Sequence, residues 1–161
     1  MDYEKAIILL SCRQAALDAA LSITERLGRA VEGVAKDEDN GEKMLSLLDE
    51  REGLLFKLGD ASSRYRSFAD SLPPEERAEL EAVRAGKAPV LGETAELRVM
   101  FGKYEDDFRR LAALDAKIGL TIKDSMSTIS KSIKSLKSSR ELMNKFIPSN
   151  NGVGTLYNQK K

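Results

Sequence analysis

Residues 93–122 read ETAELRVMFGKYEDDFRRLAALDAKIGLTI, and the spacing of their apolar side chains is the strongest indication of the fold class. Leu97 and Phe101 begin a series that steps mainly by three and four residues and continues to Ile147. An apolar series with this step lies along one face of an α-helix. The stretch therefore predicts one long helix, which Pro148 ends because proline cannot continue the hydrogen-bond ladder.

The remainder of the chain repeats the helical pattern. Apolar stripes predict three further helices, at residues 2–35, 42–72 and 74–85. Asp2 is a candidate N-cap, the run DEDNG at 37–41 favours a turn, and Pro73–Pro74 ends the second stripe. No stretch alternates apolar and polar residues, so no strand is predicted. We expect an all-α fold: an elongated antiparallel three-helix bundle or coiled coil with a short extra helix and a flexible C-terminal tail.

The same spacing predicts the core between the second and the longest helix. Eight side chains are expected to be buried there: Leu48, Leu55, Leu58, Tyr65, Leu97, Phe101, Phe108 and Leu111. Arg51 interrupts the apolar stripe of its helix. We expect its alkyl stem to pack while its guanidinium reaches solvent or an acid.

The composition argues against an enzyme and against a metal or cofactor. Histidine is absent, which removes the usual general base near neutral pH and the usual metal ligand. Cys12 is the only cysteine, so no internal disulfide or thiolate metal cage can form, and we expect it to be a small buried helix residue. The sequence predicts no catalytic residues, no metal and no cofactor.

Acidic and basic residues balance at 26 each, yet they are unevenly distributed. Residues 117–161 hold nine basic and two acidic residues, a net charge of +7. This region is either a solvated basic face or a surface that meets something acidic. Aromatic residues are not grouped as a nucleic-acid stacking platform requires, so we expect no nucleic-acid partner. The run Ala6–Leu10 is too short for a signal core or a membrane span, and we expect a cytoplasmic protein without membrane insertion.

The lengths of the predicted helices differ. At 1.5 Å per residue the longest would span roughly 80 Å and the first two about 50 and 45 Å. The part from Met126 onward would then overhang. Its apolar stripe, left without an internal partner, is predicted to bind a partner or a second copy. The stripe consists of Ile129, Ile133, Leu136, Met143 and Ile147. We accordingly divide the chain into a helical bundle at 1–147, of which 126–147 overhangs, and a flexible tail at 148–161.

The segment LLDEREGLL at residues 47–55 resembles a segment in the second helix of bacterial flagellar export chaperones of the FlgN type. The order of elements is similar too: a long first helix, this helix, a proline-broken connection, a long third helix and a glycine-containing tail with a tyrosine. The motif itself covers about nine residues, whereas the likeness in architecture extends over roughly residues 1–157.

The resemblance implies a chaperone of type III export. Such chaperones bind the C-terminal helices of hook–filament junction proteins, prevent premature assembly and deliver these clients to the export gate. In the family, the C-terminal helical part meets the client, which corresponds to the stripe described above, and Tyr157 would serve in docking of the tail. Two alternatives stay open: a structural coiled-coil protein that forms a homo-oligomer through its last helix, and a related chaperone of the filament cap.

Overall fold

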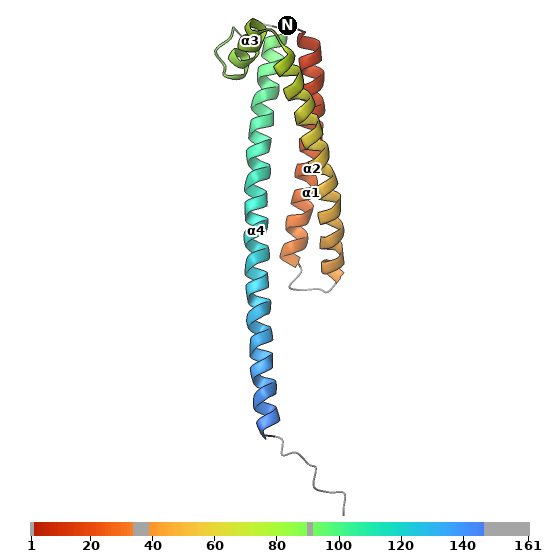
Figure 1. The fold of residues 1–161 in the computed structure, drawn as a ribbon, viewed down its shortest axis with the longest axis vertical. Helices are drawn as coiled ribbons and strands as arrows, with labels where there is room; N and C mark the ends of the chain where they lie inside the picture. The colour runs from red at the N-terminus through yellow and green to blue at the C-terminus, as the bar shows by residue number, and fades with distance from the viewer. Residues whose placement is uncertain (1, 34–38, 90–91, 147–161) are drawn as a thin grey trace, which may run out of the picture. The chain divides into compact units, whose positions relative to one another are not determined.

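The computed structural model describes residues 2–33, 39–89 and 92–146. Four helices make up the regular structure of these residues (Figure 1), and none of the described residues lies in a strand. The helices are α1 (Tyr3–Gly33), α2 (Asp39–Ser71), α3 (Pro74–Arg84) and α4 (Glu93–Phe146). The predicted all-α class is confirmed.

Local sequence signals account for most helix ends. Asp2 Oδ1 accepts a hydrogen bond from the backbone N–H of Lys5 at 3.0 Å, so Asp2 caps α1 as predicted. Pro73–Pro74 separates α2 from α3, and Pro74 stands in the first turn of α3, where its missing N–H removes no helical hydrogen bond. Gly86 follows α3 with φ of 71°, the left-handed conformation that ends many helices.

The start of α2 differs from the prediction. The helix begins at Asp39, inside the acidic run expected to form a turn, so that part of the prediction is wrong. Carboxylates in a first turn interact favourably with the positive end of the helix dipole. Glu42 therefore favours helix at a place where composition alone suggests a turn.

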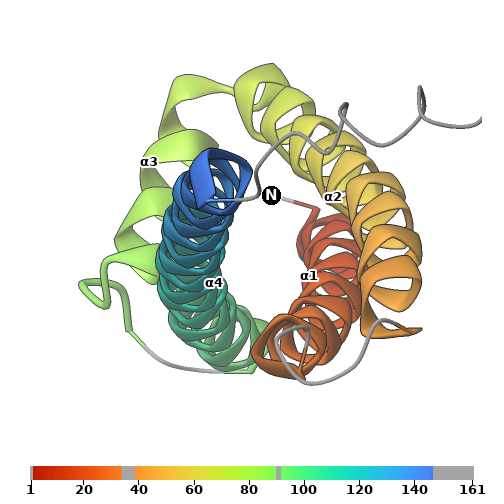
Figure 2. The same cartoon turned by 90° about the horizontal axis from the view of Figure 1, so that it is seen from below.

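Helices α1 and α2 form a close antiparallel pair (Figures 1 and 2). Ala20 of α1 is fully buried and leaves room for the neighbouring backbone. Arg13 Nε donates to Ser62 Oγ at 3.2 Å, whereas Arg26 pairs with Glu50 at 3.4 Å. The partner number on α2 falls as the number on α1 rises, which is the register of antiparallel helices.

Three ion pairs set the register of α4 against α1. In each pair the acid lies on α1 and the base lies 85 positions later on α4. They recur every seven residues: Asp18–Lys103 at 3.1 Å, Glu25–Arg110, and Glu32–Lys117 at 2.9 Å. The constant offset means that α1 and α4 run parallel, as they must if both are antiparallel to α2.

Arg51 joins the three long helices. Its Nη2 pairs with Asp115 of α4, and its Nε donates to Thr24 Oγ1 of α1 at 3.1 Å. Its side chain is largely buried, so the prediction of a packed stem and a head that reaches an acid is confirmed.

Buried apolar side chains form two clusters among these helices. One draws on all four helices and contains Ala6, Leu10, Phe68, Leu80, Val83, Leu97 and Phe101. The other draws on α1, α2 and α4 and contains Leu17, Ala20, Leu21, Leu58, Tyr104 and Leu111. Helix α3 contributes Leu80 and Val83, and the hydroxyl of Tyr3 donates to Glu79 on its polar side. That hydrogen bond is the main cause that raises the pKa of Tyr3 to about 12.

The predicted core is confirmed for four of its eight residues. Leu58, Leu97, Phe101 and Leu111 are buried, and Leu48, Leu55 and Tyr65 are half-buried. Phe108, however, is 49% exposed, so its expected burial is wrong. Tyr104 occupies the buried position, and Phe108 stacks on its outer side with ring centroids 6.1 Å apart.

The chain divides into two compact units, Met1–Thr121 and Ile122–Lys161. The boundary falls within α4. Both core clusters and the register-setting ion pairs belong to the first unit.

Leu97 and Val99 provide a matched test of this core, because both are apolar residues near the start of α4. Leu97 is 0% exposed and Val99 is 72% exposed. We expect Leu97→Ala to lower the free energy of unfolding by about 2–5 kcal/mol because it leaves a cavity. Val99→Ala should change it by less than about 0.5 kcal/mol. Urea unfolding followed by circular dichroism measures both values, and equal effects would contradict the packing described.

Candidate functional site

The predicted binding stripe lies on α4, in the unit that begins at Ile122. Met126, Ile133 and Leu136 are 67%, 47% and 69% exposed. Every side chain described between Met126 and Glu141 is exposed. Apolar side chains of this size, spaced along one face of a helix and open to water, are typical of a surface that a partner covers.

Not all predicted stripe residues can be placed. Ile129 and Met143 lie in α4, but only their backbone is described. Ile147 and Tyr157 lie outside the described residues, as does the tail from Pro148 to Lys161.

The spacing along α4 changes near the boundary between the units. The buried residues of α4 are Leu97, Phe101, Tyr104, Leu111 and Ile118, separated by four, three, seven and seven positions, which fits a seven-residue repeat of alternating steps of four and three. Two successive steps of four then lead through Ile122 to Met126, after which the alternation resumes at Ile129, Ile133 and Leu136. An extra step of four shifts the apolar face around the helix axis. The stripe predicted as continuous therefore consists of two repeats that differ in phase.

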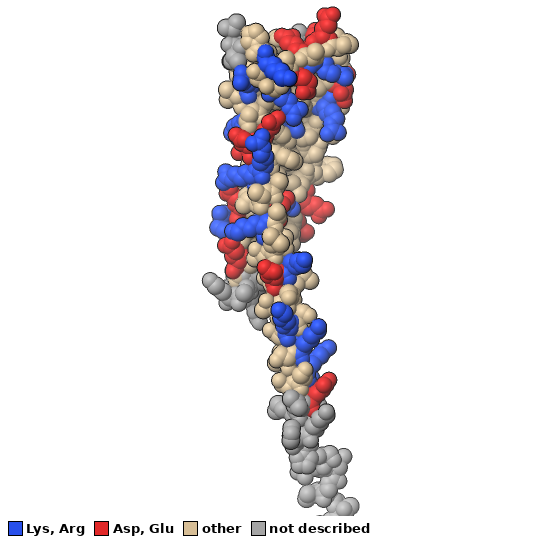
Figure 3. Space-filling model, turned by 90° about the vertical axis from the view of Figure 1, so that its left-hand side faces the viewer, with Lys and Arg blue, Asp and Glu red and all other residues tan. Residues whose placement is uncertain are grey.

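The stripe has basic and small polar neighbours. A shallow depression of about 490 Å³ is lined by Met126, Ser130, Ile133, Lys134 and Lys137. Figure 3 shows basic side chains gathered along this part of α4. The depression thus combines an apolar floor with two ammonium groups.

Serine and threonine side chains on this stretch bond back to the helix. Thr128 Oγ1 donates to the carbonyl of Asp124, and Ser138 Oγ donates to the carbonyl of Lys134, each at 3.0 Å. Such bonds slightly destabilise a helix because they compete with the backbone ladder. The side chains of this stretch therefore stabilise its helix little, and contact with a partner would stabilise it more.

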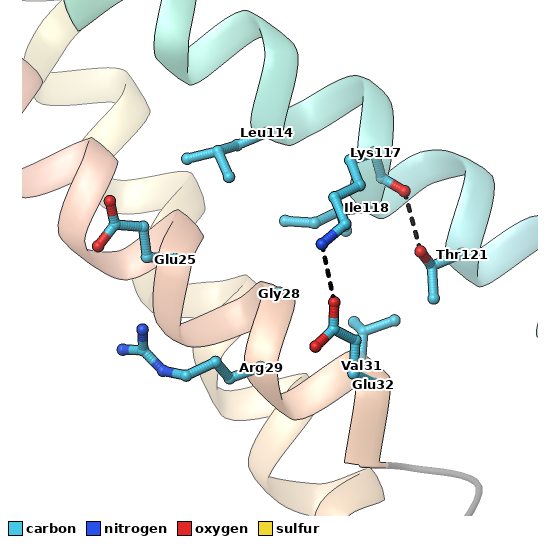
Figure 4. A pocket seen from close by; sticks show the side chains of 9 residues that line it. All are labelled: Glu25, Gly28, Arg29, Val31, Glu32, Leu114, Lys117, Ile118 and Thr121. Carbon is cyan, nitrogen blue, oxygen red and sulfur yellow. Dashed lines mark hydrogen bonds and ion pairs between the residues drawn. The ribbon is translucent and has the colours of Figure 1, made fainter.

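The first unit holds a smaller pocket between the end of α1 and α4, shown in Figure 4. Gly28 and Val31 of α1 face Leu114 and Ile118 of α4, and the cavity measures about 200 Å³. This is below the usual size of small-molecule sites, about 300–1,000 Å³. A Cβ on Gly28 would lie 3.6 Å from Ile118 Cδ1, an ordinary contact, so the space is a packing gap rather than a built site.

An ion pair closes one side of this gap. Lys117 Nζ donates to Glu32 Oε1 at 2.9 Å (Figure 4), and this hydrogen bond lowers the pKa of the Glu32 carboxyl. The pair thus holds the end of α1 against α4 and leaves no unpartnered acid for catalysis.

A tighter polar network lies farther up the same interface. Lys103 Nζ contacts Asp107 Oδ2 at 2.6 Å and Asp18 Oδ1 at 3.1 Å, and Gln14 Nε2 donates to the same two carboxylates. The hydrogen bond from Lys103 lowers the pKa of Asp107, and the same bond raises the pKa of Lys103. Both shifts favour the charged forms at neutral pH, so the network stabilises the α1–α4 contact and is unsuited to proton transfer.

The described residues offer few starting points for other chemistry. No group of three or more His, Cys, Asp or Glu side chains among them is placed to hold a metal ion. Cys12 is exposed, so its predicted burial is wrong. Leu10 and Leu17, on another face of α1, occupy the core instead.

Helix α1 is the most apolar of the long helices, so its length and hydropathy are comparable with those of a membrane span. By length and mean hydropathy, 1.5 over its most apolar window, it is the one described helix that passes as a candidate membrane span. The core helix of a folded domain passes the same test. Leu10, Leu17 and Ile23 of α1 are almost completely buried, and a third of the most apolar window is buried in all.

Comparison with known proteins finds no matching family model, no matching curated protein and no matching solved structure.

The α1–α4 network predicts a pH-dependent effect of Asp107→Asn. Because the pKa of Asp107 is lowered in the folded state, its contribution to stability is present at neutral pH and is lost as the pH falls through the folded-state pKa. We expect Asp107→Asn to cost about 1 kcal/mol at pH 7 and progressively less below about pH 4.

Asp106→Asn is the matched control, since Asp106 is an adjacent, exposed carboxylate whose partner among the described residues is Arg109 of the same helix. Chemical unfolding at several pH values measures both variants. A cost of Asp107→Asn that stays constant down to pH 2 would contradict the network.

Proposed function

We propose that the protein is a non-enzymatic helical chaperone whose α4, from Met126 onward, binds an amphipathic helix of a client protein. The observation that carries the proposal is the run of exposed apolar side chains at helical spacing, Met126, Ile133 and Leu136. The seven-residue repeat with two apolar positions is the pattern by which helices pack in coiled coils.

The specific role that we propose is that of a flagellar type III export chaperone of the FlgN type. It would bind the C-terminal helices of hook–filament junction proteins in the cytoplasm, prevent premature assembly and deliver them to the export apparatus. The resemblance at residues 47–55 and the order of helices support this role. Within the motif, Leu47 is buried and Arg51 pairs with Asp115, so its residues serve packing and the client contact is assigned to α4.

The architecture that we propose for this role is an elongated antiparallel three-helix bundle with a short fourth helix. Residues 1–147 would form the bundle, 126–147 its overhanging binding segment and 148–161 a tail, with Tyr157 a docking residue. The 85-position offset between α1 and α4 and the close α1–α2 pair support this arrangement.

The charges near the stripe indicate the chemistry of the client. Lys131, Lys134 and Lys137 lie on the same stretch of helix as the apolar side chains, and Lys134 and Lys137 line the depression. A client helix with acidic residues beside its apolar face would complement them. Hydrophobic burial would supply the affinity for the client helix, and the lysines would set its orientation.

A second copy of the chain is a less suitable occupant of the stripe. Arg140 follows Leu136 by four residues and takes an apolar-seam position of the repeat. In a parallel homodimer two Arg140 side chains would meet at this position, and like charges in a seam disfavour that pairing. A client helix with an acidic residue opposite Arg140 would avoid this repulsion between like charges.

The magnitudes suit reversible binding. Burial of four or five apolar side chains contributes about 1.5–3 kcal/mol each. Ordering of the segment on binding opposes this gain, because each residue that becomes fixed loses conformational entropy. The small net free energy would let the chaperone release its client at the export gate.

Two aspartate substitutions in the stripe test the binding surface. We expect Ile133→Asp with Leu136→Asp to abolish binding of purified hook–filament junction proteins, measured by isothermal titration calorimetry, because the apolar seam is lost. The melting temperature of the protein should hardly change, because both side chains are exposed.

Phe56→Asp is the control, since Phe56 is a large apolar side chain that is 79% exposed on α2. It should bind the clients like the unmodified protein. Binding of the double variant at full affinity would refute the proposed surface, and unfolding of the whole protein would show that the stripe is core. A monomer in light scattering of the free protein would decide against the coiled-coil dimer. Binding of the filament-cap protein, but not of hook–filament junction proteins, would favour the related chaperone.

A further inference from the structure

A pocket in the first unit brings together side chains from all four helices. It measures about 440 Å³, within the range of small-molecule sites. Arg13 of α1, Tyr65 of α2 and Arg84 of α3 face Tyr104 and Phe108 of α4 across it. The client-binding stripe does not use any of these residues.

Arg13 is held by aromatic rings rather than by an acid. Its Cζ lies 3.7 Å from the ring centroid of Tyr104 and 5.4 Å from that of Tyr65. Its Nε donates to Ser62 Oγ at 3.2 Å. Among the described residues no carboxylate lies within ion-pair distance of this guanidinium. Its charge is therefore half-buried and meets two ring faces and one hydroxyl instead of a carboxylate.

The other arginines of the pocket have acidic partners. Arg84 contacts Glu105 at 3.1 Å, and Arg109 contacts Glu105 at 3.8 Å and Asp106 at 3.2 Å. Arg13 is thus the cation of the pocket with no counter-charge among the described residues. Burial raises the pKa of Tyr65 to about 12, so this phenol stays neutral at physiological pH and does not supply one.

The geometry suits one kind of ligand. A guanidinium whose Nε is already bonded still has Nη donors that can receive a carboxylate, and the Tyr104 ring packs against it. Phe108, stacked on Tyr104 and 49% exposed, offers a flat apolar surface beside it. We propose that this pocket binds a small aromatic carboxylate, with the carboxylate on Arg13 and the ring against Phe108.

A pair of probes of equal shape tests the proposal in the full-length protein. We expect 1-naphthoate to bind with a dissociation constant of about 1 mM or tighter, given the usual affinity per atom of small ligands. The neutral 1-naphthamide should bind at least about tenfold more weakly, because it cannot form the charge-assisted pair. Nuclear magnetic resonance titration that follows the Arg13 Nε–H and the Phe108 ring locates the site.

Variants separate the guanidinium from general charge. Arg13→Gln should weaken naphthoate binding at least about tenfold, and Arg13→Lys should weaken it too, because lysine lacks the planar fork. Arg66→Gln, an exposed arginine of α2 outside the pocket, is the matched control. Phe108→Ala should weaken naphthoate binding without removing a buried core side chain. It replaces the Arg13 variants as the test if these fold poorly.

Three results would overturn the proposal: no saturable binding of naphthoate up to about ten times the expected dissociation constant, equal affinity for acid and amide, or undiminished binding by folded Arg13→Gln. None of these results bears on the stripe at Ile133 and Leu136, so this proposal and the proposed function fail independently.

Discussion

The structure depends on burial of one apolar face of α4 against α1 and α2, and that burial ends near Ile118. Helix α4 has 54 residues, whereas α1 has 31 and α2 has 33. At 1.5 Å per residue these lengths are about 81, 46 and 50 Å. Helices α1 and α2 are shorter than α4, and beyond Ile118 no described side chain of α4 is buried, with Leu120 and Met126 exposed. The proposed binding surface follows from this difference in length between α4 and the other two long helices.

Charge and packing have different roles in the first unit. The ion pairs Asp18–Lys103, Glu25–Arg110 and Glu32–Lys117 are mostly exposed, and such pairs contribute about 0–1 kcal/mol each. Apolar burial therefore stabilises the fold. The pairs instead select the register, because a shift of α4 by one turn would separate all three at once. Arg51, which contacts both Thr24 and Asp115, adds the same selection between α2 and its neighbours.

Periodicity predicted the number, type and approximate bounds of the helices, because an apolar stripe and a proline or glycine are local signals. It failed where position around the helix mattered. Phe108 and Tyr104 are both aromatic and four residues apart, and only the packing decides that Tyr104 is buried and Phe108 exposed. Cys12 lies between core positions and points outward for the same reason.

The candidate sites divide in the same way. The stripe at Ile133 and Leu136 was predicted because surplus helix length is countable in a sequence. The pocket around Arg13 was not, since it joins residues of four helices that are far apart in the chain. The step of four from Ile122 to Met126 was visible in the sequence, yet it acquires meaning only beside the boundary between the units.

Amide hydrogen exchange of the free protein, resolved along α4 and repeated at several dilutions, shows directly whether α4 is stable beyond Ile118 without a partner. We expect strong protection of the amides around Leu111 and Ile118, where α4 is packed, and rapid exchange from Met126 to Arg140, independent of protein concentration. Uniform protection along the whole of α4 at the lowest concentration would contradict this expectation, because the second half of the helix would then be stable without a partner.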